Sequence, residues 1–245
     1  MEPVATEDWR IEPVSDRCLM VVFGQHVDPA INARVHALAD HLIDQPVAGV
    51  IDVVPAFTTV AVHYRPEQIA GVGAASSPHD ALERTIAAIL ARGVTATRTE
   101  ARTVDIPVCY DEEFGPDLLE VAQACGLSRE EVIRRHGTSD HVVYMLGFAP
   151  GFPYMGGLDA SLAMPRRSTP RVKIPAGTVA IAREQSSVYT LETPGGWNLI
   201  GRTPLQLFRP RNDPPTLLRP GDHVRFVPIS RERFDELDRQ AGESA

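Results

Sequence analysis

The stretch from Tyr144 to Gln206 constrains the fold most, because glycine, proline and aromatic residues are concentrated there. It contains GFAPGFPYMGG (Gly147–Gly157), PRRSTPRVKIPAG (Pro165–Gly177) and TPGGWNLIGRTP (Thr193–Pro204). Glycine suits backbone that turns at positive φ or approaches a partner closely, and proline fixes φ and removes a hydrogen-bond donor. Such segments are typical of shaped loops around a concave surface, where functional sites usually lie.

Beyond Val142 the pattern is one of short strands separated by Gly/Pro turns, which predicts a β-barrel. The segment before it predicts one strand and two helices. These are a strand at Val104–Tyr110, a helix at Pro116–Cys125 that ends at Gly126, and a helix at Arg129–His136 with Ser128 and Glu131 as a capping box.

The first hundred residues predict a separate α+β module with the element order of a ferredoxin-like sandwich. We therefore place a domain boundary near Arg102, with an N-terminal α+β domain at residues 1–102 and a β-barrel domain at residues 103–245. The expected elements of the module are a strand at Cys18–Phe23, a helix that begins at the N-cap Asp28 and Pro29, strands at Val50–Val54 and Thr58–Tyr64, a helix at His79–Arg92 and a strand within Thr95–Val104.

The composition of the 245-residue chain excludes several classes of function. Its net charge of −8 argues against nucleic-acid binding, which usually needs a basic surface. No apolar run is long enough to cross a membrane and no signal peptide is recognisable, so we expect a cytoplasmic protein. Cys18, Cys109 and Cys125 lack the spacing of metal ligands, so we expect no metal site.

The chain also lacks the motifs of a self-sufficient ATPase or hydrolase: it has no Walker A loop, no GxSxG elbow and no HExxH. Between Asp140 and Val227, however, basic residues outnumber acidic ones. This favours an anionic ligand or an acidic partner surface, with a solvated basic face as the alternative. A component that supplies part of a shared site fits these features.

Four cations lie close together between prolines: Arg166, Arg167, Arg171 and Lys173. Guanidinium groups bind carboxylate or phosphate through paired hydrogen bonds, and lysine supplies a point charge. We take Arg166 and Lys173 as catalytic candidates, and Arg167 and Arg171 as substrate-binding candidates. The alternative is an exposed basic loop that aids solubility or contacts an acidic partner.

The TPGGWN segment supplies further candidates. Gly195 and Gly196 would present backbone N–H groups as an anion-binding nest, or form a tight turn. Trp197 would stack on a substrate, or anchor a core or an interface. Arg202 follows at the end of a predicted strand, as a catalytic candidate or as half of a structural ion pair.

The aromatic loop and one histidine complete the set. Phe152 and Tyr154, with Phe148 and Met155, predict an apolar wall for a substrate or for a partner protein. His136 is a candidate acid or base because the pKa of a histidine lies near neutrality, and a core or capping histidine is the alternative.

Four motifs in order resemble the signature of the KipI / allophanate hydrolase subunit 1 family, whose members are mostly described as the B subunit of bacterial 5-oxoprolinase (PxpB). They are GFAPGFPYMGGLD, PRRSTPRVKIPAGTVAIA, TPGGWNLIGRTPL and LLRPGDHVRF, and the match covers roughly Val104 to Val227. The resemblance implies an α+β fold, with a small N-terminal ferredoxin-like α/β domain followed by a cyclophilin-like β-barrel. The chain departs from the family pattern at Ala180 and Arg183, where glycine is usual, and at Ser186-Ser187, where a Thr-Gly pair is usual.

The resemblance implies an enzyme component that is inactive alone. It would act with a C subunit of the allophanate hydrolase subunit 2 type and an A subunit of the LamB/YcsF type, and the complex would open 5-oxo-L-proline to L-glutamate. ATP, with Mg²⁺, would be a cofactor shared with the partner subunits. The alternatives are a KipI-like inhibitor of a sensor histidine kinase and a component associated with urea carboxylase or allophanate hydrolase.

Overall fold

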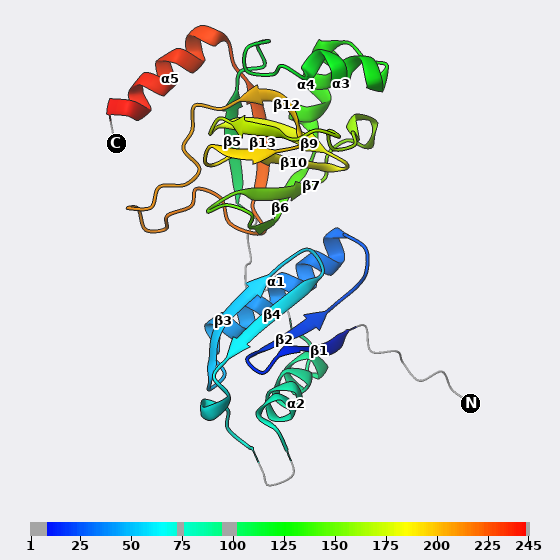
Figure 1. Ribbon diagram of the computed structural model, residues 1–245, viewed down its shortest axis with the longest axis vertical. Coiled ribbons are helices and arrows are strands. Elements are labelled where there is room, and N and C mark those ends of the chain that lie inside the picture. Colours follow the sequence, from blue (N-terminus) through cyan, green and yellow to red (C-terminus); the bar gives the residue numbers. More distant parts are fainter. Residues whose placement is uncertain (1–8, 73–75, 95–101, 244–245) are drawn as a thin grey trace, which may run out of the picture. The chain divides into compact units, whose positions relative to one another are not determined.

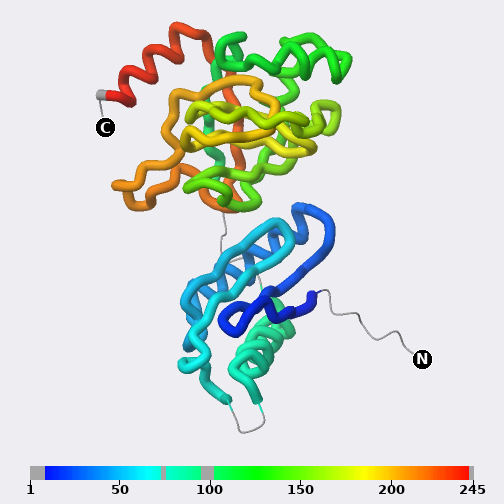
Figure 2. Tube along the Cα trace, viewed as in Figure 1, coloured from blue at the N-terminus to red at the C-terminus, as the bar shows by residue number. Residues whose placement is uncertain are grey.

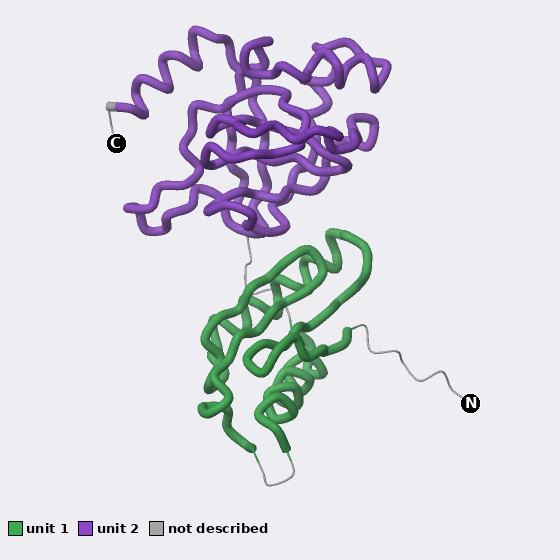
Figure 3. Tube along the Cα trace, in the orientation of Figure 1, with its two compact units in different colours: residues 1–100 green, residues 101–245 purple. Residues whose placement is uncertain are grey.

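The computed structural model describes residues 9–72, 76–94 and 102–243. The chain has two compact units, Met1–Glu100 and Ala101–Ala245, each with its own hydrophobic core (Figure 3). A mixed α/β architecture with a nearly closed barrel-like sheet confirms the expected fold class. The boundary between the units lies beside Arg102; that each unit folds independently stays a prediction.

Limited proteolysis tests that prediction. We expect a stable C-terminal fragment that begins between about residues 95 and 108, the usual margin for a boundary placed from sequence. Mass spectrometry of the resistant fragment identifies its first residue. Cleavage confined to Gly147–Arg171, with the chain intact near Arg102, would contradict two separate folding units.

Unit 1 is a four-stranded antiparallel sheet with two helices, and its strands lie in the order β1-β2-β4-β3 (Figure 1). Its core joins apolar side chains of the sheet to those of both helices, among them Val21, Val62, Leu38 and Ile86. The elements are β1 (Arg10–Ser15), β2 (Cys18–Val22), α1 (Pro29–Asp44), β3 (Val50–Pro55), β4 (Thr59–Tyr64), η1 (Pro66–Gln68) and α2 (Pro78–Ala91).

The first helix of unit 1 begins where its capping residues predict. The Asp28 carboxylate accepts hydrogen bonds from the N–H groups of Ala30 at 2.8 Å and Ile31 at 3.2 Å, and Pro29 occupies the first helical position. These bonds satisfy two of the amides that a helix N-terminus leaves unpaired.

The sheet of unit 1 has an edge strand that the sequence analysis did not predict. This strand, β1, precedes β2 and pairs with it antiparallel. Most of β1 is exposed and it contains Pro13, so it lacks the apolar alternation by which strands are recognised. Of the strand expected within Thr95–Val104, residues 95–101 lie outside the described residues, and Thr103 and Val104 belong to a strand of unit 2.

Unit 2 contains a seven-stranded sheet in the order β12-β9-β10-β7-β6-β13-β5 and a separate two-stranded sheet, β11-β8 (Figure 1). Its elements are β5 (Thr103–Val108), α3 (Leu118–Cys125), α4 (Arg129–Thr138), β6 (His141–Leu146), β7 (Pro153–Gly156), η2 (Ala160–Leu162), β8 (Arg171–Ile174), β9 (Thr178–Ala182), β10 (Gln185–Val188), β11 (Thr193–Gly195), β12 (Asn198–Arg202), β13 (His223–Pro228) and α5 (Arg231–Glu243).

The large sheet is nearly closed into a barrel. Its two outer strands, β12 and β5, meet where Cys109 and Arg202 exchange two backbone hydrogen bonds of 2.9 Å each. Strands β5 and β13 lie side by side and parallel, although they come from the two ends of the unit's sequence (Figure 2). Closure of this kind pairs strand edges that would otherwise be exposed.

Alternate residues of the central strand β9 face two different cores. Val179 and Ile181 join the main core with residues of α3 and α4, whereas Ala180 and Ala182 face a second, aromatic core. This alternation follows from the two-residue period of a strand. All four side chains are buried, because both faces of the strand are covered.

The helices of the barrel unit begin and end close to the predicted residues. Helix α3 ends at Gly126, whose φ of 67° is left-handed. Ser128 caps α4 through the N–H of Glu131 at 3.2 Å. The predicted capping box is only half formed, since the Glu131 carboxylate binds Arg134 and Arg135 at 2.7 Å each.

Candidate functional site

A buried carboxylate organises the arginine segment. Asp117, whose side chain is 4% exposed, forms a two-pronged salt bridge with Arg171 at 2.7 and 2.9 Å and accepts a third bond from Arg167 at 3.1 Å. Its Oδ2 also accepts the N–H of Leu199 at 2.7 Å. Arg167 continues to Glu120 at 2.8 Å. Two of the four predicted cations are therefore neutralised within the chain, which ties β8 and β12 to the start of α3.

Sequence reasoning missed Asp117. It stands directly before α3, and an aspartate there is typical of a helix cap. Its side chain makes no capping bond and reaches instead the two arginines, which lie 50 and 54 residues later in the chain. No local signal marks so distant a pairing.

The predicted aromatic residues gather in one cluster. Phe152 lies 5.1 Å from Tyr154 and 6.1 Å from Trp197, measured between ring centroids. Trp197 is buried with Phe152 and Tyr189, so it is a core residue, which was its alternative interpretation. Met155 lies in the main core instead and is not part of this wall.

Two side chains extend the aromatic cluster toward solvent. The guanidinium of Arg166 lies 5.7 Å from the Trp197 ring centroid, a cation–π contact, and its side chain is exposed. Phe148 is 63% exposed and packs edge-on against Phe152 at 5.2 Å. Its φ of 70° is left-handed, which is unusual for a bulky residue and is a feature of functional loops.

The glycine pair serves close packing. Neither Gly195 nor Gly196 has a positive φ, so neither supplies the left-handed residue of an αR-αL nest, and their role in anion binding stays a prediction. A Cβ at Gly195 would lie 2.1 Å from the Tyr189 hydroxyl. The Gly196 carbonyl accepts the N–H of Arg167 at 2.7 Å. Both glycines thus position the arginine segment against the aromatic cluster.

The remaining catalytic candidates do not join this cluster. Lys173 lies on the same two-stranded sheet, but its exposed ammonium pairs with Glu192 at 2.8 Å. Arg202 donates to the carbonyl of Ala176 at 3.1 Å and lies 5.7 Å from the ring centroid of Phe114. Arg202 is the last residue of β12, and both of these contacts lie outside the aromatic cluster.

His136 lies inside the main core with no exposed surface. Its Nδ1 is 2.8 Å from the Tyr110 hydroxyl and its Nε2 is 3.2 Å from the Ser186 hydroxyl. Burial, with His141 nearby, lowers the pKa of His136 well below 6.5. Neutral hydroxyl partners on both nitrogens favour the structural interpretation over an acid or base role.

The departures from the family pattern have local explanations. Ala180 places its methyl group in the aromatic core. Ser186 binds His136, and the Ser187 hydroxyl donates to the carbonyl of Pro153 at 2.7 Å. Arg183 stands in the tight turn between β9 and β10 at a φ of 53°, a conformation that glycine adopts more readily.

Within the described ranges, no three His, Cys, Asp or Glu side chains are grouped as a metal site would require. In the same ranges no helix combines the length and the apolar character that a membrane crossing demands.

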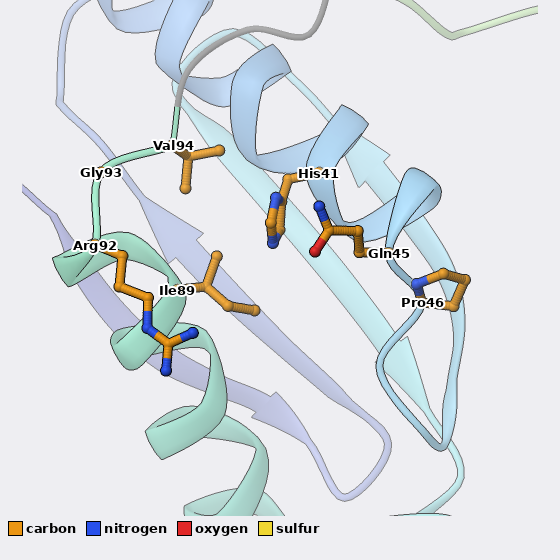
Figure 4. Close-up of a pocket in the computed structure, with 7 residues that line it drawn as sticks. All are labelled: His41, Gln45, Pro46, Ile89, Arg92, Gly93 and Val94. Carbon is orange, nitrogen blue, oxygen red and sulfur yellow. The ribbon is translucent and has the colours of Figure 1, made fainter.

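Unit 1 contains a hollow of about 430 Å³ at the C-terminal ends of α1 and α2. In Figure 4 the side chains of His41 and Gln45 lie on one side of it, and those of Ile89 and Arg92 on the other. None of the predicted site residues lines it.

Comparison with known proteins gives a consistent result. The family model of the carboxyltransferase domain, subdomain C and D, matches residues 9–218. The chain belongs to this family. Over 234 residues it is 47% identical to a Bacillus subtilis protein named as the B subunit of 5-oxoprolinase, and the match covers 94% of this chain and 96% of that one. A protein of the same name from Escherichia coli O157:H7 is 45% identical over 219 residues, covering 88% and 94%. The family resemblance is confirmed.

Solved structures of chains of similar length, and of longer chains, share the fold. PH0987 from Pyrococcus horikoshii is 40% identical, with a TM-score of 0.54 over 92% of this chain and all of that one. TTHA0988 is 38% identical, with a TM-score of 0.74 over 87% of this chain, which spans only 40% of that chain. The urea carboxylase of Kluyveromyces lactis, 18% identical with a TM-score of 0.71 over 93% of this chain and 22% of that one, shows the fold alone.

Proposed function

We propose that the chain is the B subunit of an ATP-dependent 5-oxoprolinase that opens 5-oxo-L-proline to L-glutamate. The observation that carries the proposal is the near full-length match, at 47% identity, to a protein named as that component of 5-oxoprolinase. The partners would be one protein of the allophanate hydrolase subunit 2 type and one of the LamB/YcsF type. The likeness to a urea amidolyase from Lachancea kluyveri covers only 25% of the chain, so the urea-linked alternative has weaker support.

The side chains available to such a site are few. Arg167 and Arg171 are neutralised by Asp117, whereas Arg166 has a cation–π contact with Trp197 and is exposed. A guanidinium on an aromatic wall suits the carboxylate of the substrate. ATP with Mg²⁺ would supply the activation of the stable lactam. On this chain, Arg166 is the predicted cation at which a bound anion would meet exposed positive charge, whereas the equally exposed Lys173 is paired with Glu192.

Reconstitution tests the proposal. We expect the purified chain alone to produce no glutamate from 5-oxoproline and ATP, and the chain with both partner types to produce it at a rate that depends on ATP. Glutamate and ADP are measured in parallel. Glutamate formation by the single chain would contradict its role as one component of a complex. Inhibition of a sensor kinase without any hydrolysis in the reconstituted complex would favour the KipI-like alternative.

Substitutions in the arginine segment should distinguish residues that act in the reaction from residues that only stabilise the fold. Arg166→Ala should leave the melting temperature unchanged and lower turnover of the complex about tenfold, the effect of one charge-assisted contact. Arg171→Ala should lower the melting temperature, because Asp117 loses its two-pronged partner. Lys173→Ala should leave stability within about 0.5 kcal/mol, since its ion pair is exposed.

The control for this series is Arg219→Ala, which removes an exposed guanidinium elsewhere in unit 2. Wild-type turnover in Arg166→Ala, with assembly intact, would remove Arg166 from the site. Weakened assembly with normal turnover at saturating partner would make the segment an interface.

A further inference from the structure

Most of the positive charge in unit 2 is already paired. Arg102 binds Asp222, Arg225 binds Asp105, and Arg231 binds both Glu113 and Asp235. Arg209 and Arg211 differ. They form no ion pair within the described part of the chain, and both line a hollow of about 420 Å³ between the loop after β12 and the end of α5.

A tight turn places the two arginines. The N–H of Asn212 donates to the carbonyl of Arg209 at 3.0 Å, which closes a four-residue turn. Pro210 occupies its second position, where the fixed φ of proline suits a turn. Two further backbone hydrogen bonds join the two sides of the loop that carries this turn. The Arg209 N–H donates to the carbonyl of Pro215 at 2.7 Å, and the Leu217 N–H donates to the carbonyl of Leu207 at 2.8 Å. The two guanidiniums therefore come from a loop tip that is ordered by its own backbone bonds.

The other walls of the hollow suit a small polar anion. Gln206 and Asn212 contribute amide groups, Phe208 and Pro210 contribute apolar surface, and Ala241 of α5 leaves room opposite the turn. The orange loop and the red end of α5 lie on the same side of unit 2 in Figure 1. Asp213 beside the turn and Asp238 one helical turn before Ala241 form no ion pair with either arginine among the described residues.

We infer that this hollow, which we call the RPRN site (Arg209, Pro210, Arg211, Asn212), binds a phosphate-bearing anion. Two unneutralised guanidiniums bring two positive charges to one hollow. A phosphate group carries about −1.5 to −2 charges at neutral pH and has several strong acceptor oxygens, whereas one carboxylate would neutralise only half of this charge. The ligand is inorganic phosphate, pyrophosphate or the phosphate chain of a nucleotide. The site is distinct from the Arg166 segment.

The test is calorimetric titration of the full chain at low ionic strength with pyrophosphate, with ADP and with citrate. We expect pyrophosphate to bind, with an affinity that falls as salt is added because both arginines are exposed. ADP distinguishes a nucleotide site from a site for free phosphate, since a nucleotide site binds it more tightly than pyrophosphate. Arg209→Gln and Arg211→Gln should each weaken binding at least tenfold, and Arg211→Lys should weaken it less. The matched control Arg219→Gln should bind like the wild type.

Absence of pyrophosphate and ADP binding by the wild-type chain would overturn the inference. So would equal loss in the Arg219→Gln control, or tighter binding of citrate than of pyrophosphate. Melting temperatures of all variants are measured first, and we expect them to match the wild type because the loop tip is exposed. The measurement needs no turnover, so a failure to reconstitute 5-oxoprolinase would leave its result unchanged.

Discussion

Replacing Asp117 with alanine will lower the free energy of unfolding of the chain by about 3 kcal/mol, the lower end of the range for breaking a buried ion pair. The carboxylate is 4% exposed and binds two guanidiniums that are each 29% exposed. Without it, two positive charges face each other in a half-buried place, and the N–H of Leu199 loses its acceptor. The effect is at the lower end because both arginines can still turn partly toward water.

Thermal and urea unfolding of Asp117→Ala measure this loss. Asp117→Asn keeps the shape and one acceptor for Leu199, so it should be less destabilising than alanine. The matched control is Glu120→Ala, which removes a 60% exposed carboxylate that binds Arg167 and should change stability by less than about 1 kcal/mol. Equal stability of Asp117→Ala and the Glu120→Ala control would show that the buried cluster does not hold the barrel unit together.

Acid will destabilise the barrel unit through its buried histidines. Burial lowers the pKa of His141 to about 4 and holds the pKa of His136 well below its usual value. The unfolded chain therefore binds more protons than the folded chain as the pH falls below 6.5, and the free energy of unfolding decreases with it. For His141 alone, the drop in pKa from 6.5 to about 4 corresponds to about 3 kcal/mol in the free energy of unfolding. Nearly all of this stability is lost by pH 4.

Urea unfolding between pH 7 and pH 4 measures this slope. In His141→Gln, whose amide can still donate to the carbonyl that His141 now contacts at 3.0 Å, the decline should be shallower by the contribution of one histidine. His26→Gln, a change at an exposed histidine, should leave the profile as in the wild type. A His141→Gln profile that parallels the wild type would show that His141 is protonated in the folded state.

Local signals predicted the parts of the fold that local interactions determine. Asp28 with Pro29 begins α1 as expected, and Gly126 ends α3, because the capping bonds join residues a few positions apart. Phe152 and Tyr154 were predicted to lie together, whereas the packing of Trp197 against Phe152 became apparent only in the folded barrel.

The parts that depend on distant contacts escaped prediction. Helix α5 was not expected, since its sequence is highly charged and Phe234 is the one buried side chain in its described part. It is held by Phe234 and Arg231, which pack on the ring of Phe114, more than a hundred residues earlier. The Asp117 cluster escaped for the same reason, because only the folded barrel shows which arginines meet a carboxylate.

The pairing of β5 with β13 has a consequence for synthesis on the ribosome. Thr103 pairs with His223 and Val108 with Pro228, so the first strand of the barrel finds its neighbour only when the last one has been made. A nascent chain must therefore keep the unpaired edge of β5 away from other chains while more than a hundred residues are added. The sheet of unit 1 does not depend on a strand that is synthesised late, because all its described strands come from the first 64 residues. Vectorial synthesis thus favours an order in which unit 1 is complete while the barrel is still open.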